Sequence, residues 1–182
     1  MRSPKLCFAV ILAIETAGCA SNSALPERPS EQTVQVVGMA GRLTINSNST
    51  ASKSAIAAPI EQVWRVLPAV FDSLGVAVST VNQVQHLIGN DALKVRQRLG
   101  KAPLSRYLDC GQTQIGPNAD SYDVMLTLLV QLQPNGAGST TVFSTVEATA
   151  KPIAFAQSAS ACSSKGSLES RLTTLVQTLL PR

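Results

Sequence analysis

Apolar side chains recur at helical spacing in two segments of the chain. The first stripe follows Pro59 and consists of Ile60, Val63, Trp64, Leu67, Val70, Phe71 and Leu74. Proline at the first helical position and glycine just past the last are typical helix boundaries, so the pattern predicts a helix that ends at Gly75, with a kink at Pro68. The second stripe consists of Leu168, Leu172, Leu175, Val176 and Leu179. It predicts a C-terminal helix that Ser164 or Ser167 caps.

Between the two stripes, apolar and polar residues alternate or form short apolar runs, which is typical of β-strands. The predicted strands cover residues 52–57, 76–81, 84–88, 93–99, 122–132 and 140–150. Asn135-Gly136 predicts a hairpin between the last two strands, and residues 104–108 suit a short helical turn. Neither helix can bury its stripe alone, so both must cover the same face of the sheet. The sequence therefore predicts one α+β domain over residues 51–182, an antiparallel sheet covered on one face by two helices.

The amino-terminal residues have the order of a bacterial export signal. Two basic residues come first, and the apolar run Leu6–Ile14 follows, far shorter than the ~20 residues of a membrane-spanning helix. Thr16-Ala17-Gly18-Cys19 then resembles the lipobox of bacterial lipoproteins, in which small residues precede a cysteine. The resemblance implies that residues 1–18 are removed and that the Cys19 thiol carries a diacylglycerol. Several acyl chains then hold such a protein on its membrane.

This segment departs from the lipobox pattern at Thr16, where leucine is usual, and at Glu15, a charge close to the cleavage point. An ordinary signal-peptidase cut after Ala20 therefore stays open as the alternative. The lipobox resemblance, with no Asp after Cys19, implies attachment to the outer membrane on its periplasmic side. Residues 19–50 would then be the lipidated cysteine and a flexible tether, because residues 20–32 are rich in Ser, Pro and other polar types.

The cysteine count supports export independently. One of the four cysteines, Cys7, lies in the signal, and Cys19 is the candidate lipid site. Cys110 and Cys162 remain, and in an oxidising compartment two such cysteines are expected to form a disulfide. A reactive thiol at Cys162, three residues before Lys165, is the competing interpretation.

The element order over about residues 51–180 resembles a second known arrangement. A strand, a helix, several antiparallel strands and a final helix are similar to the helix-grip fold of BamC-like assembly lipoproteins and of START-type lipid carriers. The segments 104–111 and 162–169 also resemble uncharacterised bacterial envelope proteins of this layout. The similarity to these uncharacterised proteins implies no known activity.

The residues that carry most catalytic chemistry are missing from the sequence. His86 is the only histidine, which excludes a His-rich metal site, and no Gly-x-Ser-x-Gly or Ser-x-x-Lys motif is present. No glycine-rich loop for phosphates occurs. The formal net charge of +4 is small and scattered, which argues against nucleic-acid binding. We therefore expect a protein that is not an enzyme and that has no cofactor and no metal.

Two groups of residues remain as candidate sites. Asn118, Asp120 and Asp123 have oxygen ligands at a spacing that suits Ca²⁺, although such residues also stabilise turns through their own backbone. The second group is a predicted basic surface formed by Lys94, Arg96, Arg98, Lys101 and Arg106. It suits anionic headgroups, lipopolysaccharide phosphates or an acidic partner. The alternative is a solvated strand face whose charges discourage aggregation.

These features lead to two functional hypotheses. The first is a non-catalytic envelope module that binds a protein or cell-envelope partner while it is held at the membrane. The second is a carrier of a lipid or small apolar ligand in a cleft between the sheet and the C-terminal helix. A filled interface between sheet and helices favours the first, and a cavity there favours the second.

Overall fold

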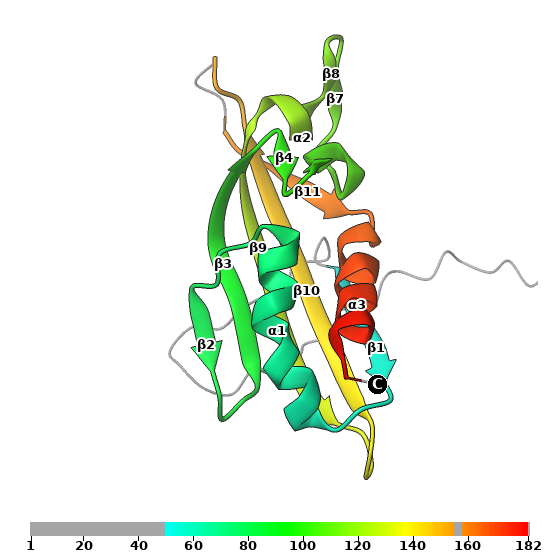
Figure 1. Cartoon of the computed structure of the whole chain (residues 1–182). Coiled ribbons are helices and arrows are strands. Elements are labelled where there is room, and N and C mark those ends of the chain that lie inside the picture. The colour runs from blue at the N-terminus through cyan, green and yellow to red at the C-terminus, as the bar shows by residue number, and fades with distance from the viewer. Residues whose placement is uncertain (1–49, 155–157, 182) are drawn as a thin grey trace, which may run out of the picture. The chain divides into compact units, whose positions relative to one another are not determined.

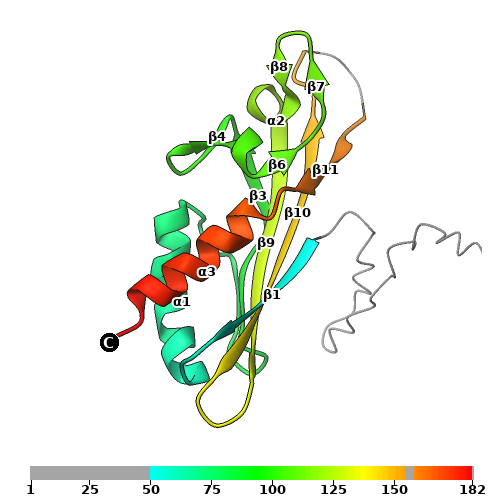
Figure 2. The same ribbon diagram turned by 90° about the vertical axis from the view of Figure 1, so that its right-hand side faces the viewer.

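The computed structural model describes residues 50–154 and 158–181, all of which belong to one folded unit. The predicted signal, Cys19 and most of the tether therefore lie outside the described residues. Two long helices lie on one face of an antiparallel sheet (Figures 1 and 2). The elements are β1 (Thr50–Ile56), α1 (Ile60–Leu74), β2 (Thr80–Asn82), β3 (Leu87–Arg96), β4 (Arg98–Leu99), β5 (Ala102–Pro103), the 3-10 helix η1 (Leu104–Arg106), β6 (Leu108–Asp109), β7 (Gln112–Thr113), β8 (Gly116–Pro117), α2 (Asn118–Ser121), β9 (Asp123–Pro134), β10 (Thr140–Lys151), β11 (Ser160–Ser164) and α3 (Ser167–Leu179). The predicted α+β class with an antiparallel sheet is confirmed.

The hairpin of β9 and β10 forms the centre of the sheet. The two strands pair over their full length, from Thr140 opposite Pro134 to Lys151 opposite Asp123. The Asn135 N–H donates to the Ser139 carbonyl and closes the predicted turn. β3 pairs with the other edge of β9 and β2 with β3, while β1 and β11 pair with two successive stretches of β10.

The core lies between this sheet and the two helices. Alternate residues of β9 have no more than 2% of their surface exposed, and they are Val124, Leu126, Leu128, Val130 and Leu132. The buried apolar positions of α1 and α3 belong to the predicted stripes, and they are Val63, Leu67, Val70, Phe71, Leu74, Leu168, Leu172 and Val176. Leu179 of the predicted stripe is 39% exposed. α1 and α3 also contact each other. Side chains thus fill the interface between helices and sheet.

The ends of α1 agree closely with the sequence pattern. Pro59 lies one position before the first helical residue rather than at it, and its carbonyl accepts the N–H groups of Gln62 and Val63. Gly75 has a φ of 74°, the left-handed conformation that glycine adopts without strain, and its N–H donates to the Asp72 carbonyl. Pro68 lies inside the helix, on its exposed side.

The strands before β9 differ from the prediction. The predicted strands 84–88 and 93–99 are largely one strand, β3, whose register against β9 shifts between Asn90 and Leu93. The Asn90 side chain holds this bulge, because its amide donates to the Ala77 carbonyl and its oxygen accepts the Ala92 N–H. The predicted strand does not continue to residue 99, because Gln97 has a φ of 63° and turns the chain.

The start of α3 also differs from the prediction. Neither Ser164 nor Ser167 is the N-cap residue, which is Gly166. The Ser164 hydroxyl instead accepts the Gly166 N–H at 3.1 Å and donates to Glu169 Oε1 at 2.6 Å. The Glu169 side chain is buried, and its Oε2 has no hydrogen-bond partner among the described residues. Ser164 is therefore the only described side chain that satisfies this carboxylate.

Replacing Ser164 with alanine is expected to lower the free energy of unfolding by about 2 kcal/mol. The change leaves the buried Glu169 carboxylate without its donor and removes an acceptor for the Gly166 N–H. Urea denaturation of the full chain measures the loss. Ser164→Thr keeps the hydroxyl and serves as the control. Equal stabilities of the two variants would show that the hydroxyl does not support the helix end.

Candidate functional site

Cys110 and Cys162 form the predicted disulfide, with an S–S distance of 2.06 Å. Cys110 directly follows β6, which pairs with β11, the strand that contains Cys162. Both half-cystines are buried, with 6% and 3% of their surface exposed. The interpretation of Cys162 as a reactive thiol is therefore wrong. Cys19, the predicted lipidation site, lies outside the described residues.

The predicted basic surface is exposed, and the chain turns within it at Gln97. Its members are Lys94, Arg96, Arg98, Lys101 and Arg106, and each is exposed. Lys94 and Arg96 lie two residues apart on β3, on the face of the sheet opposite the helices. Arg98 and Lys101 lie beyond the turn, where the Arg98 guanidinium donates to the Lys101 carbonyl. Arg106 lies at the end of η1. Arg98 is opposite Arg96 where β4 pairs with β3, so the structure brings Arg96 and Arg98 together across the turn.

Lys94 and Arg96 have different charged neighbours. The Lys94 ammonium lies 3.3 Å from Asp123 Oδ2, in a solvent-exposed ion pair of the kind that contributes about 0–1 kcal/mol. Arg96 is opposite Asp123 in the β3–β9 register, yet it forms no ion pair within 4 Å in the part of the chain that the structure describes. Arg96 is therefore the member of this pair whose charge is free to meet a ligand.

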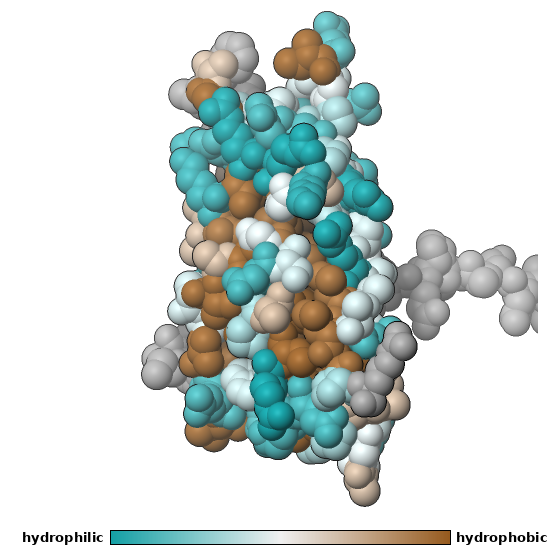
Figure 3. Space-filling model, in the orientation of Figure 1, coloured by the Kyte–Doolittle hydropathy of each residue, from teal (hydrophilic) through white to brown (hydrophobic). Residues whose placement is uncertain are grey.

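Arg96 also borders a pocket of about 580 Å³ at the end of the sheet. The lining residues are Arg96, Thr113, Gln114, Ile115, Ser121, Tyr122, Pro152, Ile153 and Ala154. Ile115 lies in the turn between β7 and β8 and is 90% exposed, and Ile153 follows β10 and is 48% exposed. Apolar surface is visible at the tip of the β7–β8 hairpin in Figure 3. The sequence patterns did not predict Ile115 or Ile153 as site residues, although isolated isoleucines between turn-forming residues are a usable signal.

The candidate calcium ligands have structural partners. Asp120 accepts the Ser105 N–H at 2.8 Å and the Ser105 hydroxyl at 2.6 Å. Asn118 donates to the Cys110 carbonyl at 3.1 Å, and Asp123 faces Lys94. Over residues 50–154 and 158–181, no three His, Cys, Asp or Glu side chains are grouped in a way that could hold a metal ion. The turn-stabilising interpretation of this loop thus fits the hydrogen bonds.

Replacing Asp120 with alanine is expected to lower the free energy of unfolding by about 1–2 kcal/mol, because the change leaves two partly buried donors of Ser105 unpaired. Asp123→Ala is the control, since it removes a nearby carboxylate at the start of β9 whose ion pair with Lys94 is partly exposed. Thermal unfolding followed by circular dichroism compares the two. A larger loss of stability in the Asp123 variant would contradict the structural role of Asp120.

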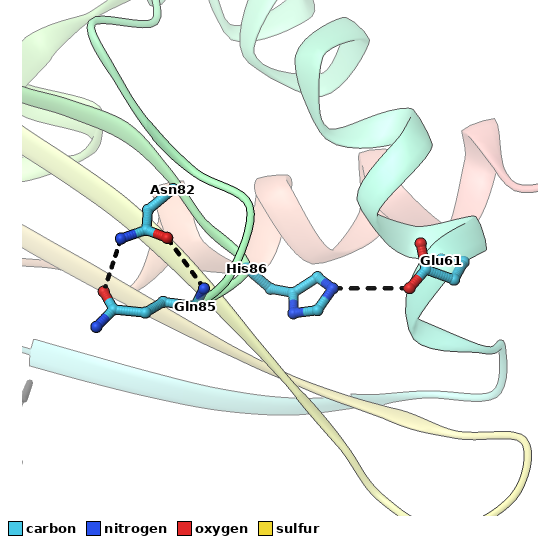
Figure 4. A network of polar contacts seen from close by, with 4 residues as sticks. All are labelled: Glu61, Asn82, Gln85 and His86. Carbon is cyan, nitrogen blue, oxygen red and sulfur yellow. Dashed lines mark hydrogen bonds and ion pairs between the residues drawn. The ribbon is translucent and has the colours of Figure 1, made fainter.

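His86 connects the turn between β2 and β3 to the start of α1 (Figure 4). Its Nε2 lies 3.7 Å from Glu61 Oε1, and its ring meets the Trp64 ring edge-on, with centroids 5.5 Å apart. In the same turn the Asn82 side chain accepts the Gln85 N–H and donates to the Gln85 side chain. These contacts fit a structural role for His86, whose φ is 47°.

No family model matches this chain, and no curated protein is significantly similar to it. Within the described residues, none of the helices combines the length and apolar character that crossing a bilayer requires.

Proposed function

We propose that the protein is an exported, non-catalytic envelope lipoprotein whose helix-grip-like domain binds a protein or cell-envelope partner. The observation that carries the proposal is the buried Cys110–Cys162 disulfide, because structural disulfides persist in oxidising compartments. The order of the amino-terminal residues agrees with it: a basic start, an apolar run and a lipobox-like Thr16–Cys19. Attachment to the outer membrane, facing the periplasm, is part of this proposal.

The packing of the core favours a partner-binding module over a carrier with a ligand between sheet and helix. Leu67 and Phe71 of α1, Leu172 of α3, and Leu126 and Leu128 of β9 are fully buried. Their side chains occupy the space in which the carrier hypothesis places its ligand. The domain is therefore proposed to act through its surface.

Metabolic labelling tests the anchor. The full chain is expressed in a two-membrane bacterium that is fed an alkyne analogue of palmitate, and the label is read on the purified protein. We expect labelling of the natural chain and of Cys7→Ser, whose substitution lies in the signal core, and none of Cys19→Ser. Equal labelling of the Cys7 and Cys19 variants, or a natural chain without label, would contradict the proposal.

Photo-crosslinking in intact cell envelopes tests whether the basic residues beyond Gln97 contact a partner. We expect the double variant Arg98→Glu, Lys101→Glu to lose a cross-linked species that the natural chain forms. Arg65→Glu makes the same kind of change at an exposed position of α1 and is expected to keep that species. Loss in both variants would point to net charge rather than to a defined contact.

A further inference from the structure

We propose that the pocket at the end of the sheet binds a single-chain anionic amphiphile, a molecule with one hydrocarbon chain that ends in a carboxylate or a phosphate. This site is separate from the packed interface between helices and sheet. The proposal also does not depend on lipidation of Cys19.

The lining of the pocket favours a hydrocarbon chain. Ile115 and Ile153 expose 90% and 48% of their surfaces, and Tyr122, Pro152 and Ala154 add further apolar surface. Covering such side chains removes apolar surface from water, which favours binding of a hydrocarbon chain. The volume of about 580 Å³ lies within the range of small-molecule sites.

The charges around the pocket favour an anionic end group. Among the described residues that line the pocket, Arg96 is the only charged one. Asp123 is opposite Arg96 in the β3–β9 register, but its carboxylate forms its ion pair with Lys94, at 3.3 Å. A guanidinium binds a carboxylate or a phosphate through two parallel hydrogen bonds, which gives the ligand a defined orientation.

The polar groups of the lining argue against an extended peptide. The Thr113 hydroxyl donates to the Gly116 carbonyl at 3.2 Å, and the Ser121 hydroxyl donates to the Pro117 carbonyl at 3.3 Å. Pro152 has no backbone N–H to offer. A peptide would bring amide groups that need partners in the pocket, whereas a hydrocarbon chain has none.

The test uses the full chain in phosphatidylcholine vesicles and three photoactivatable probes with the same diazirine-bearing chain. The probes end in a carboxylate, in a phosphate or in an alcohol. We expect the two anionic probes to form adducts on peptides that contain Ile115, Tyr122 or Ile153, and the alcohol to form about tenfold fewer. Comparing the carboxylate with the phosphate identifies which head group the site prefers. Equal labelling by the alcohol, or adducts located mainly elsewhere, would overturn the proposal.

Two pairs of variants show whether the pocket itself is responsible. Arg96→Gln is expected to lower labelling by the anionic probes about five- to tenfold, whereas Arg65→Gln, at an exposed position of α1, keeps it. Ile153→Asn is expected to lower labelling by all three probes. Val84→Asn changes an exposed apolar residue of the β2–β3 turn and is expected to have no effect. A two-chain diazirine phosphatidylglycerol that labels the same peptides as strongly would contradict a single-chain ligand and point to the membrane surface.

Discussion

Replacing both Cys110 and Cys162 with alanine is expected to lower the free energy of unfolding by about 4 kcal/mol. The disulfide joins residues 52 positions apart, and without it the unfolded chain gains the freedom of an open loop of that length. A loss of this size is a large part of the stability of a typical domain. Chemical denaturation of the full chain, followed by fluorescence of Trp64, measures it.

The natural chain with its disulfide reduced is the matched control, because it loses the cross-link but keeps both sulfur atoms. We expect the reduced chain and the double alanine variant to unfold at similar denaturant concentrations. A reduced chain as stable as the oxidised one would mean that the cross-link contributes little to the fold.

Replacing Gly89 with alanine is expected to lower the free energy of unfolding by about 3 kcal/mol or to prevent folding. Gly89 is opposite Leu129 where β3 pairs with β9, and an added methyl group would lie against the Leu128 carbonyl oxygen and 2.9 Å from Leu129 Cα. Both are backbone atoms that cannot rotate away. The strands would therefore have to separate and give up hydrogen bonds of the sheet, each with a net contribution of about 1 kcal/mol.

Gly138→Ala is the matched control for this substitution. Gly138 lies in the loop between β9 and β10, and an added methyl group there has no neighbour within 4 Å. We expect its stability to stay within about 0.5 kcal/mol of the natural chain. Thermal unfolding of both variants distinguishes the close approach of two strands from a general effect of removing glycine. Similar losses in both variants would contradict the packing argument.

The elements that the sequence predicted well have local signals of their own. The α1 stripe ends at Gly75, and Asn135-Gly136 marks the turn between the two longest strands. The course of β3 depends instead on a contact across the chain, because the Asn90 side chain bonds to the Ala77 carbonyl and holds the bulge. The alternation of polar and apolar residues cannot predict that contact. The strand was therefore predicted as two pieces, and its end at Arg96 was missed.

The candidate sites also differ in how far the sequence alone predicts them. The disulfide followed from counting cysteines and from their compartment, and the structure confirms it. The basic residues were predicted as one surface because alternation along a straight strand places them together. The positive φ at Gln97 instead turns the chain, so that Arg98 lies on β4 opposite Arg96 and not further along β3. The pocket beside Arg96 joins the β7–β8 turn to the segment after β10, and no pattern within either segment predicts that they meet.

The pairing of β1 with β10 has a consequence for how an exported chain would acquire its structure. β1 is the first described strand, yet its partner residues are Thr140 to Val146, far along the chain. If the chain crosses a membrane amino end first, β1 emerges early and has no partner until β10 has followed. The β9–β10 hairpin can form as soon as it emerges, because its contacts are local. We therefore expect β1 to join the sheet late. Until then its unpaired backbone is exposed to aggregation, and chaperones would have to protect it during translocation.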